Sequence, residues 1–149
     1  MLYTIWLLIG ILLATFFLWV ARSRGLQREP MILALGLIVA AIIYVGFALV
    51  WGNTQWVAIE IGGLLLYTVF VLLAQRHNLV WLAVGWAVHP LWDIGLHWLG
   101  QGHTVAPEWY IFACLSFDLV VAGYMVTRLN RWKPNASRIY RRSEKDPCA

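Results

Sequence analysis

Charged side chains are scarce in this sequence. Asp, Glu, Lys and Arg make up 12% of its 149 residues, whereas 62% are hydrophobic. A soluble domain of this size carries about twice that share of charge on its surface. The scarcity therefore excludes a soluble domain and predicts an integral membrane protein, so any activity must reside in or at the bilayer.

Cysteine is also rare, and its placement excludes a structural disulfide. Cys114 lies inside an apolar run and Cys148 lies near the C-terminal end, so the two are badly placed to meet. A net charge of +4 is present, but it is concentrated beside apolar segments. We interpret it as a sign of topology and of contact with anionic lipid, and we predict no nucleic-acid partner.

Long apolar runs are what the sequence has in abundance. Each is about 20 residues long and so can cross a hydrocarbon core of about 30 Å. The runs cover residues 2–21, 31–51, 55–75, 79–99 and 108–128. They predict an all-α, polytopic membrane bundle of five transmembrane helices that forms one domain over residues 1–128. We expect the first run to be a retained span and not a cleaved signal.

The basic residues predict the topology of this bundle. All eleven lie in the first connection, in the third connection or in the segment from Arg128 onward, and the other two connections contain none. The positive-inside rule then places the N-terminus outside and the C-terminus in the cytoplasm. The basic tail, residues 129–149, is typical of a segment that lies along an anionic membrane surface.

Three carboxylates sit inside the apolar runs: Glu60, Asp93 and Asp118. No lysine or arginine is near them in sequence. A charged carboxylate in hydrocarbon costs several kcal/mol, so each must be protonated, paired with histidine or neutralised by a bound metal.

The stretch HPLWDIGLH in the fourth run places His89, Asp93 and His97 at intervals of four residues. On an α-helix these three side chains share one face. The predicted topology brings Glu60 and Asp118 from neighbouring helices toward the same volume, which we expect to open toward the outer face.

Imidazole together with carboxylate is the ligand set preferred by zinc, iron or manganese. We therefore predict a site for a divalent metal, completed or supplied with solvent by His97, His103 or Glu108. If the protein is an enzyme, Asp93 or Glu60 is the candidate general base and the substrate is lipid-soluble. The predicted ligands are His89, Asp93, His97, Glu60 and Asp118.

Three alternatives remain open from the residues. The same groups can shuttle protons without a metal, as in an isomerase or a proton-coupled transporter. They can also form an interhelical polar network with Tyr44 and Tyr67 as donors and no further role. Finally, a chain this small can be an accessory subunit that packs against other membrane subunits, or a homo-oligomer.

The stretches GWAVHPLWDIGLH and APEWYIFACLSFDLV resemble an uncharacterised family of small bacterial multi-pass membrane proteins. The resemblance covers roughly residues 31 to 128 and rests mainly on Gly85, Trp86, His89, Asp93 and His97. It implies a bacterial inner-membrane location and adds no chemistry, because no activity is established for that family.

Overall fold

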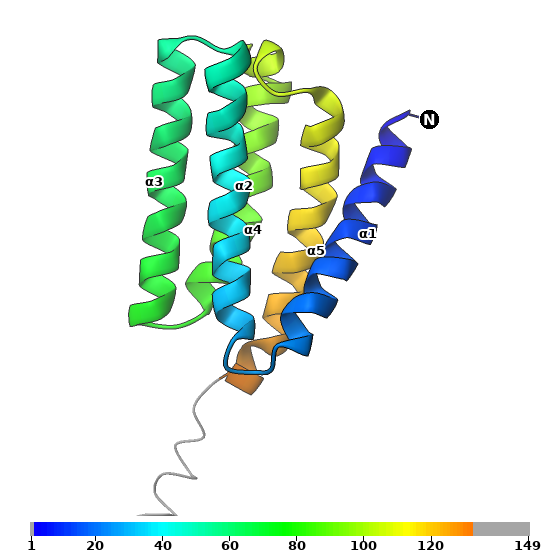
Figure 1. Cartoon of the computed structure of the whole chain (residues 1–149), viewed down its shortest axis with the longest axis vertical. Coiled ribbons are helices and arrows are strands. Elements are labelled where there is room, and N and C mark those ends of the chain that lie inside the picture. Colours follow the sequence, from blue (N-terminus) through cyan, green and yellow to red (C-terminus); the bar gives the residue numbers. More distant parts are fainter. Residues whose placement is uncertain (1, 133–149) are drawn as a thin grey trace, which may run out of the picture.

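A computed structural model describes residues 2–132 and shows an all-helical, up-and-down bundle (Figure 1). Successive helices run in opposite directions, so the connections alternate between the upper and lower ends. The elements in chain order are α1 (Leu2–Ser23), α2 (Glu29–Trp51), α3 (Thr54–Arg76), α4 (Val80–Asp93), the π-helix η1 (Ile94–Trp98), the short 3-10 helix η2 (Gln101–Thr104) and α5 (Glu108–Trp132). The predicted all-α class is confirmed.

Four of these helices, α1, α2, α3 and α5, are long and apolar enough to cross a membrane. Large apolar side chains cover their outer faces, as the 69% exposure of Leu12 on α1 and the 68% exposure of Leu49 on α2 illustrate. The fourth predicted run differs, because its α-helix ends at Asp93 and continues directly as η1. Helix α5 extends to Trp132, beyond the predicted end of the fifth run; the predicted basic tail lies outside the described residues from position 133 onward.

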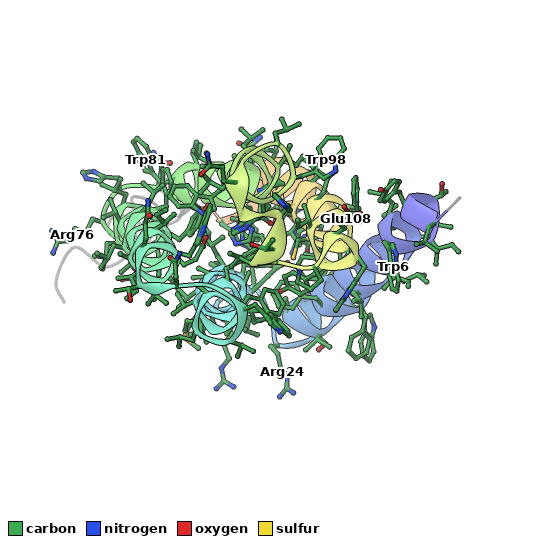
Figure 2. The ribbon with its side chains drawn as sticks, turned by 90° about the horizontal axis from the view of Figure 1, so that it is seen from above. Trp6, Arg24, Arg76, Trp81, Trp98 and Glu108 are labelled. Atoms are coloured by element: carbon green, nitrogen blue, oxygen red, sulfur yellow. The ribbon has the colours of Figure 1, made fainter. Side chains whose placement is uncertain are left out.

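The described arginines gather at the lower end of the bundle. Arg22 lies in the last turn of α1, Arg76 in the last turn of α3, and Arg131 in the last turn of α5. Seen from above, Arg24 and Arg76 project away from the bundle (Figure 2). The alternation of basic and non-basic connections in the sequence therefore corresponds to the two ends of the fold.

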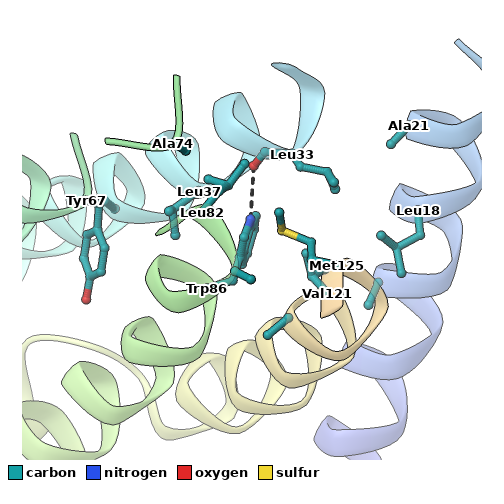
Figure 3. Close-up of a cluster of buried hydrophobic side chains, with 14 residues drawn as sticks. Leu18, Ala21, Leu33, Leu37, Tyr67, Ala74, Leu82, Trp86, Val121 and Met125 are labelled. Atoms are coloured by element: carbon teal, nitrogen blue, oxygen red, sulfur yellow. Dashed lines mark hydrogen bonds between the residues drawn. The ribbon is translucent and has the colours of Figure 1, made fainter. Parts of the chain in front are cut away.

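The core is built around Trp86 on α4. This side chain is fully buried, and its indole N–H donates a 3.1 Å hydrogen bond to the carbonyl oxygen of Leu33 on α2 (Figure 3). Leu37 and Met125 pack in the same cluster from α2 and α5. Trp86 thereby joins three helices, since a buried indole needs both apolar contact and an acceptor for its N–H.

Helices α1 and α5 approach closely because small residues lie between them. A Cβ atom added at Gly10 would stand 2.1 Å from the carbonyl oxygen of Ala113 and 2.1 Å from the Ser116 hydroxyl oxygen. The Ser116 hydroxyl donates a 2.8 Å hydrogen bond to the carbonyl oxygen of Leu7 across the same contact. Gly10 and the fully buried Ala14 thus serve as a small-residue interface, a common way for apolar helices to associate.

One buried acid escaped the sequence analysis, which assigned Glu29 to a connection. Glu29 is the first residue of α2 and is fully buried. Its carboxylate accepts hydrogen bonds from Arg128 at 2.9 Å, from Trp132 at 3.0 Å and from the hydroxyl of Tyr124. The ion pair joins the lower end of α5 to α2. Within residues 2–132, Glu60, Asp93 and Asp118 have no such arginine or lysine partner.

We predict that Gly10→Ala weakens the α1–α5 contact. The new methyl group cannot fit beside the backbone of α5, so α1 must move outward, and the free energy of unfolding should fall by about 2 kcal/mol or more. Denaturant titration in detergent micelles measures this. Gly62→Ala is the matched control, because a Cβ there meets nothing within 4 Å and alanine favours a helix. Equal effects of the two substitutions would contradict the packing described above.

We predict that Arg128→Ala lowers the free energy of unfolding by about 2 kcal/mol, because it leaves the buried Glu29 carboxylate without its cation. The value lies between those of exposed and fully buried ion pairs, since the pair is shielded by protein but lies at the end of the bundle. Arg131→Ala, at an exposed position three residues along, should change stability little. The same titration compares the two variants, and Glu29→Gln should reduce the difference between them.

Candidate functional site

The polar residues of the site project inward from α3, α4, η1 and α5. Helix α4 packs against α3 on one side and α5 on the other. His89 and Asp93 lie one turn apart on α4, and Asp118 reaches them from α5. All three side chains are at most 1% exposed. The neighbouring helices thus place two carboxylates and an imidazole in one dry volume.

The three side chains are close enough to share a ligand. His89 Nδ1 lies 2.9 Å from Asp118 Oδ2 and 3.4 Å from Asp93 Oδ2, and one ligand atom from each residue falls within 4.8 Å of the others. Two ligands held about 2.1 Å from one divalent ion are themselves roughly 3.0 to 3.4 Å apart. The distances from His89 Nδ1 to the two carboxylate oxygens therefore suit coordination of a common ion as well as a hydrogen bond.

Asp93 is the member of this cluster whose carboxylate is not compensated by a donor or a cation among the described residues. Neither of its carboxylate oxygens has a hydrogen-bond partner among the described residues, although the side chain is fully buried. Within residues 2–132, no lysine or arginine lies at ion-pair distance from Asp93, Asp118 or Glu60. A buried carboxylate without a donor or cation is costly, and native proteins contain few such groups.

Two tyrosines line the same interior. The ring of Tyr44 on α2 lies 5.6 Å from the His89 ring, and the ring of Tyr67 on α3 lies 4.9 Å from it. Both hydroxyl groups are buried and have no hydrogen-bond partner in the described part of the chain. They supply donors near the carboxylates, but in this arrangement they do not satisfy them.

The predicted ligands His97 and Glu60 form a second cluster. Glu60 Oε1 on α3 lies 2.9 Å from His97 Nε2, yet the approach is not aligned as a hydrogen bond, and neither atom has another partner in the described part of the chain. The Tyr44 ring lies next to both clusters, with its centroid 5.0 Å from that of His97 and 5.6 Å from that of His89. The five predicted ligands therefore divide into a group of three and a group of two.

The rise along the helix explains this division. His97 follows His89 by eight residues, or about 12 Å along the axis, which is too far for the two imidazoles to share one ion even on a continuous α-helix. The helix also changes form between them: the N–H of Leu99 bonds to the carbonyl oxygen of Ile94, five residues earlier. At that level His97 faces Glu60 on α3. Single π-turns of this kind are frequent at functional sites.

The loop after η1 fixes the proton on His97. His97 Nδ1 lies 3.2 Å from the carbonyl oxygen of Gly102, and because a carbonyl only accepts, Nδ1 must carry a hydrogen. A Cβ on Gly102 would stand 2.7 Å from Nδ1, so only glycine permits the approach. Gly102 was not predicted as part of the site, because a single glycine in a loop carries no recognisable sequence pattern.

Access from the upper end differs from the prediction. The connection between η1 and α5 folds over His97, and a cavity of about 230 Å³ there is lined by Trp51 and residues 103–107, with none of the five predicted ligands. His103 and Glu108 are exposed and join neither cluster. The five predicted ligands are at most 2% exposed, so the predicted opening toward the outer face is not seen in this structure.

Comparison with protein-family models, with characterised proteins and with solved structures finds no match to this chain. The resemblance noted from the sequence thus stays a prediction, and the argument for function rests on the geometry of the two clusters.

We predict that Glu60→Leu destabilises the protein more than Glu60→Gln does. Leucine leaves His97 Nε2 facing apolar atoms, whereas the amide of glutamine keeps a polar partner at the same distance. The loss for leucine should be about 1–3 kcal/mol in the free energy of unfolding. Denaturant titration in micelles compares the two variants, and a leucine variant as stable as wild type would show that the Glu60–His97 contact has no structural weight.

Proposed function

We propose that this chain is an integral membrane protein whose helix bundle binds a divalent metal ion at His89, Asp93 and Asp118. The observation that carries the proposal is the state of Asp93. Its side chain is fully buried, and neither of its oxygens has a hydrogen-bond partner in residues 2–132. His89 and Asp118 lie beside it.

A proton alone satisfies this cluster less well than a metal does. The proton on His89 Nδ1 can be donated to Asp118 Oδ2 at 2.9 Å, but the same proton is then unavailable to Asp93 at 3.4 Å. A divalent ion binds all three side chains at once and neutralises both carboxylates. Nitrogen with two oxygens is a ligand set that suits zinc, iron or manganese.

The proposal includes five membrane crossings. Helix α4 with its 14 residues and η1 with its 5 form one uninterrupted rod, roughly 27 Å long and so close to the thickness of the hydrocarbon core. The clustering of Arg22, Arg76 and Arg131 at the lower end supports a cytoplasmic lower end and an outer N-terminus. The bacterial inner membrane remains the predicted location.

A bound ion in this site would act as a Lewis acid or lower the pKa of a bound water. Asp93 and Glu60 remain the candidate general bases. Their positions differ, because Asp93 lies within the three-residue cluster whereas Glu60 faces His97.

A metal-free, proton-carrying function is the second candidate, and His97 favours it. Because Nδ1 carries a hydrogen, a neutral His97 presents a bare acceptor at Nε2 to the Glu60 carboxylate. Two bare acceptors 2.9 Å apart repel, so one of the two groups must carry a proton, although their present approach is not aligned as a hydrogen bond. A protonated group beside a buried acceptor is an arrangement from which proton transfer proceeds once the two groups align.

We expect elemental analysis of the purified protein to find one divalent metal ion per chain. The ion should be lost in His89→Ala and in Asp93→Ala, and its affinity should fall at least tenfold in the more conservative Asp93→Asn, because an amide supplies no charge. His103→Ala is the matched control and should keep the ion, since His103 is exposed and lies outside the cluster. Size-exclusion chromatography in detergent checks that each variant is folded. A folded wild-type protein that takes up no zinc, iron or manganese would contradict the metal proposal and favour the proton-carrying function.

A further inference from the structure

A second cavity lies at the side of the bundle, next to the cluster of His89, Asp93 and Asp118. It has a volume of about 320 Å³ and lies between α1, α2 and α5. Each helix contributes a stripe of side chains to its wall, beginning with Trp6 on α1, Gly36 on α2 and Trp109 on α5. Asp118 forms part of the wall, so the cavity adjoins one of the three proposed metal ligands.

The shape of the bundle explains this cavity. Helix α1 packs along α5 but contacts α2 over a short stretch only. Figure 1 shows α1 tilted, so that it lies near α2 at the lower end and diverges from it toward the N-terminus. The space between the two helices therefore faces sideways, toward the acyl chains of the bilayer, and not toward the water at either end.

The chemistry of the wall specifies what can bind. Its lining is apolar and aromatic apart from Asp118, Cys114 and Tyr110. Asp118 Oδ1 is buried and has no hydrogen-bond partner in residues 2–132, whereas Oδ2 already contacts His89. A ligand that supplies one donor to Oδ1 gains a hydrogen bond in a dry site, where an unpaired acceptor is costly.

We infer that this cavity binds a neutral, mainly apolar small molecule that enters from the membrane and directs a hydroxyl group to Asp118. The volume lies at the lower end of the range of about 300–1,000 Å³ for small-molecule sites, which fits one short isoprenoid or similar chain. The described wall contains no lysine or arginine that could pair with an anionic head group, so we expect a neutral ligand. The inference rests on the proposed function, and it names the substrate or ligand class of that site.

The test uses the full chain in lipid nanodiscs and a photoreactive analogue of farnesol that carries a diazirine near its tail. Labelling should saturate, and mapped peptides should come from α1, α2 and α5. Unlabelled farnesol should compete at least tenfold better than farnesene, which matches its hydrocarbon but has no hydroxyl. Labelling that does not saturate, that spreads over all outer faces, or that farnesene blocks equally well would overturn the inference and indicate ordinary lipid contact.

Cavity-filling substitutions on α2 give the matched comparison. Ala40 and Val39 line the cavity, whereas Leu49 lies outside it on another face of the same helix and is 68% exposed. Ala40→Phe and Val39→Trp should each reduce saturable labelling at least fivefold, and Leu49→Trp should leave it unchanged. If both filling variants are folded and label like wild type, the ligand does not occupy this cavity. A cross-link that joins the cavity to a second copy of the chain would overturn the inference as well.

Metal content, measured on the same samples, separates the inference from the proposed function. The filling variants should keep their metal, because they leave His89, Asp93 and Asp118 in place. A wild-type protein without metal that still shows saturable, cavity-confined labelling would refute the metal site and support the ligand site. A protein that holds its metal but labels without saturation would do the reverse.

Discussion

The constraint on which the site depends is the burial of Asp93 and Asp118 side by side, with no lysine or arginine of residues 2–132 beside them. Two carboxylates in a dry interior repel each other and have lost their hydration. Among the described residues, His89 stands between them, at 2.9 Å from one and 3.4 Å from the other. The packing of α4 against its neighbours must hold this arrangement against its electrostatic cost, and the core around Trp86 contributes to that packing.

The bundle treats its buried acids in two different ways. At the lower end, Glu29 is satisfied by Arg128, Trp132 and Tyr124, so its role is explained by the joining of α2 to α5. In the middle, Asp93 has no such set of donors among residues 2–132. The fold thus pairs one buried acid with a cation at its lower end and leaves the carboxylate oxygens of Asp93 without a hydrogen bond in its interior. This difference is the reason why we propose an ion at Asp93, and an apolar cavity lies beside the neighbouring Asp118.

Much of the fold could be predicted from the sequence, because apolar runs of helical length and the segregation of basic residues are local properties of the chain. The pairing of His89 with Asp93 was equally accessible, since a four-residue interval fixes a shared helix face. The place of His97 was not. It depends on Glu60, which meets His97 from another helix, and on Gly102, whose carbonyl reaches His97 only after the loop folds back. The π-helix in which His97 lies was not predicted from the sequence either. Glu29 was missed because its partner Arg128 lies 99 residues away in sequence.

The sequence by itself determined that this chain forms helices fit for a membrane and that three acids lie within them, because composition and periodicity act over a few turns of one helix. Only the tertiary structure decided which acids meet. Which side chains meet depends on how neighbouring helices are placed and tilted against one another. Asp118 therefore joins His89 and Asp93, whereas Glu60 pairs with His97. The lateral cavity is likewise a product of the tilt of α1 against α2, a relation between two helices that neither helix encodes alone.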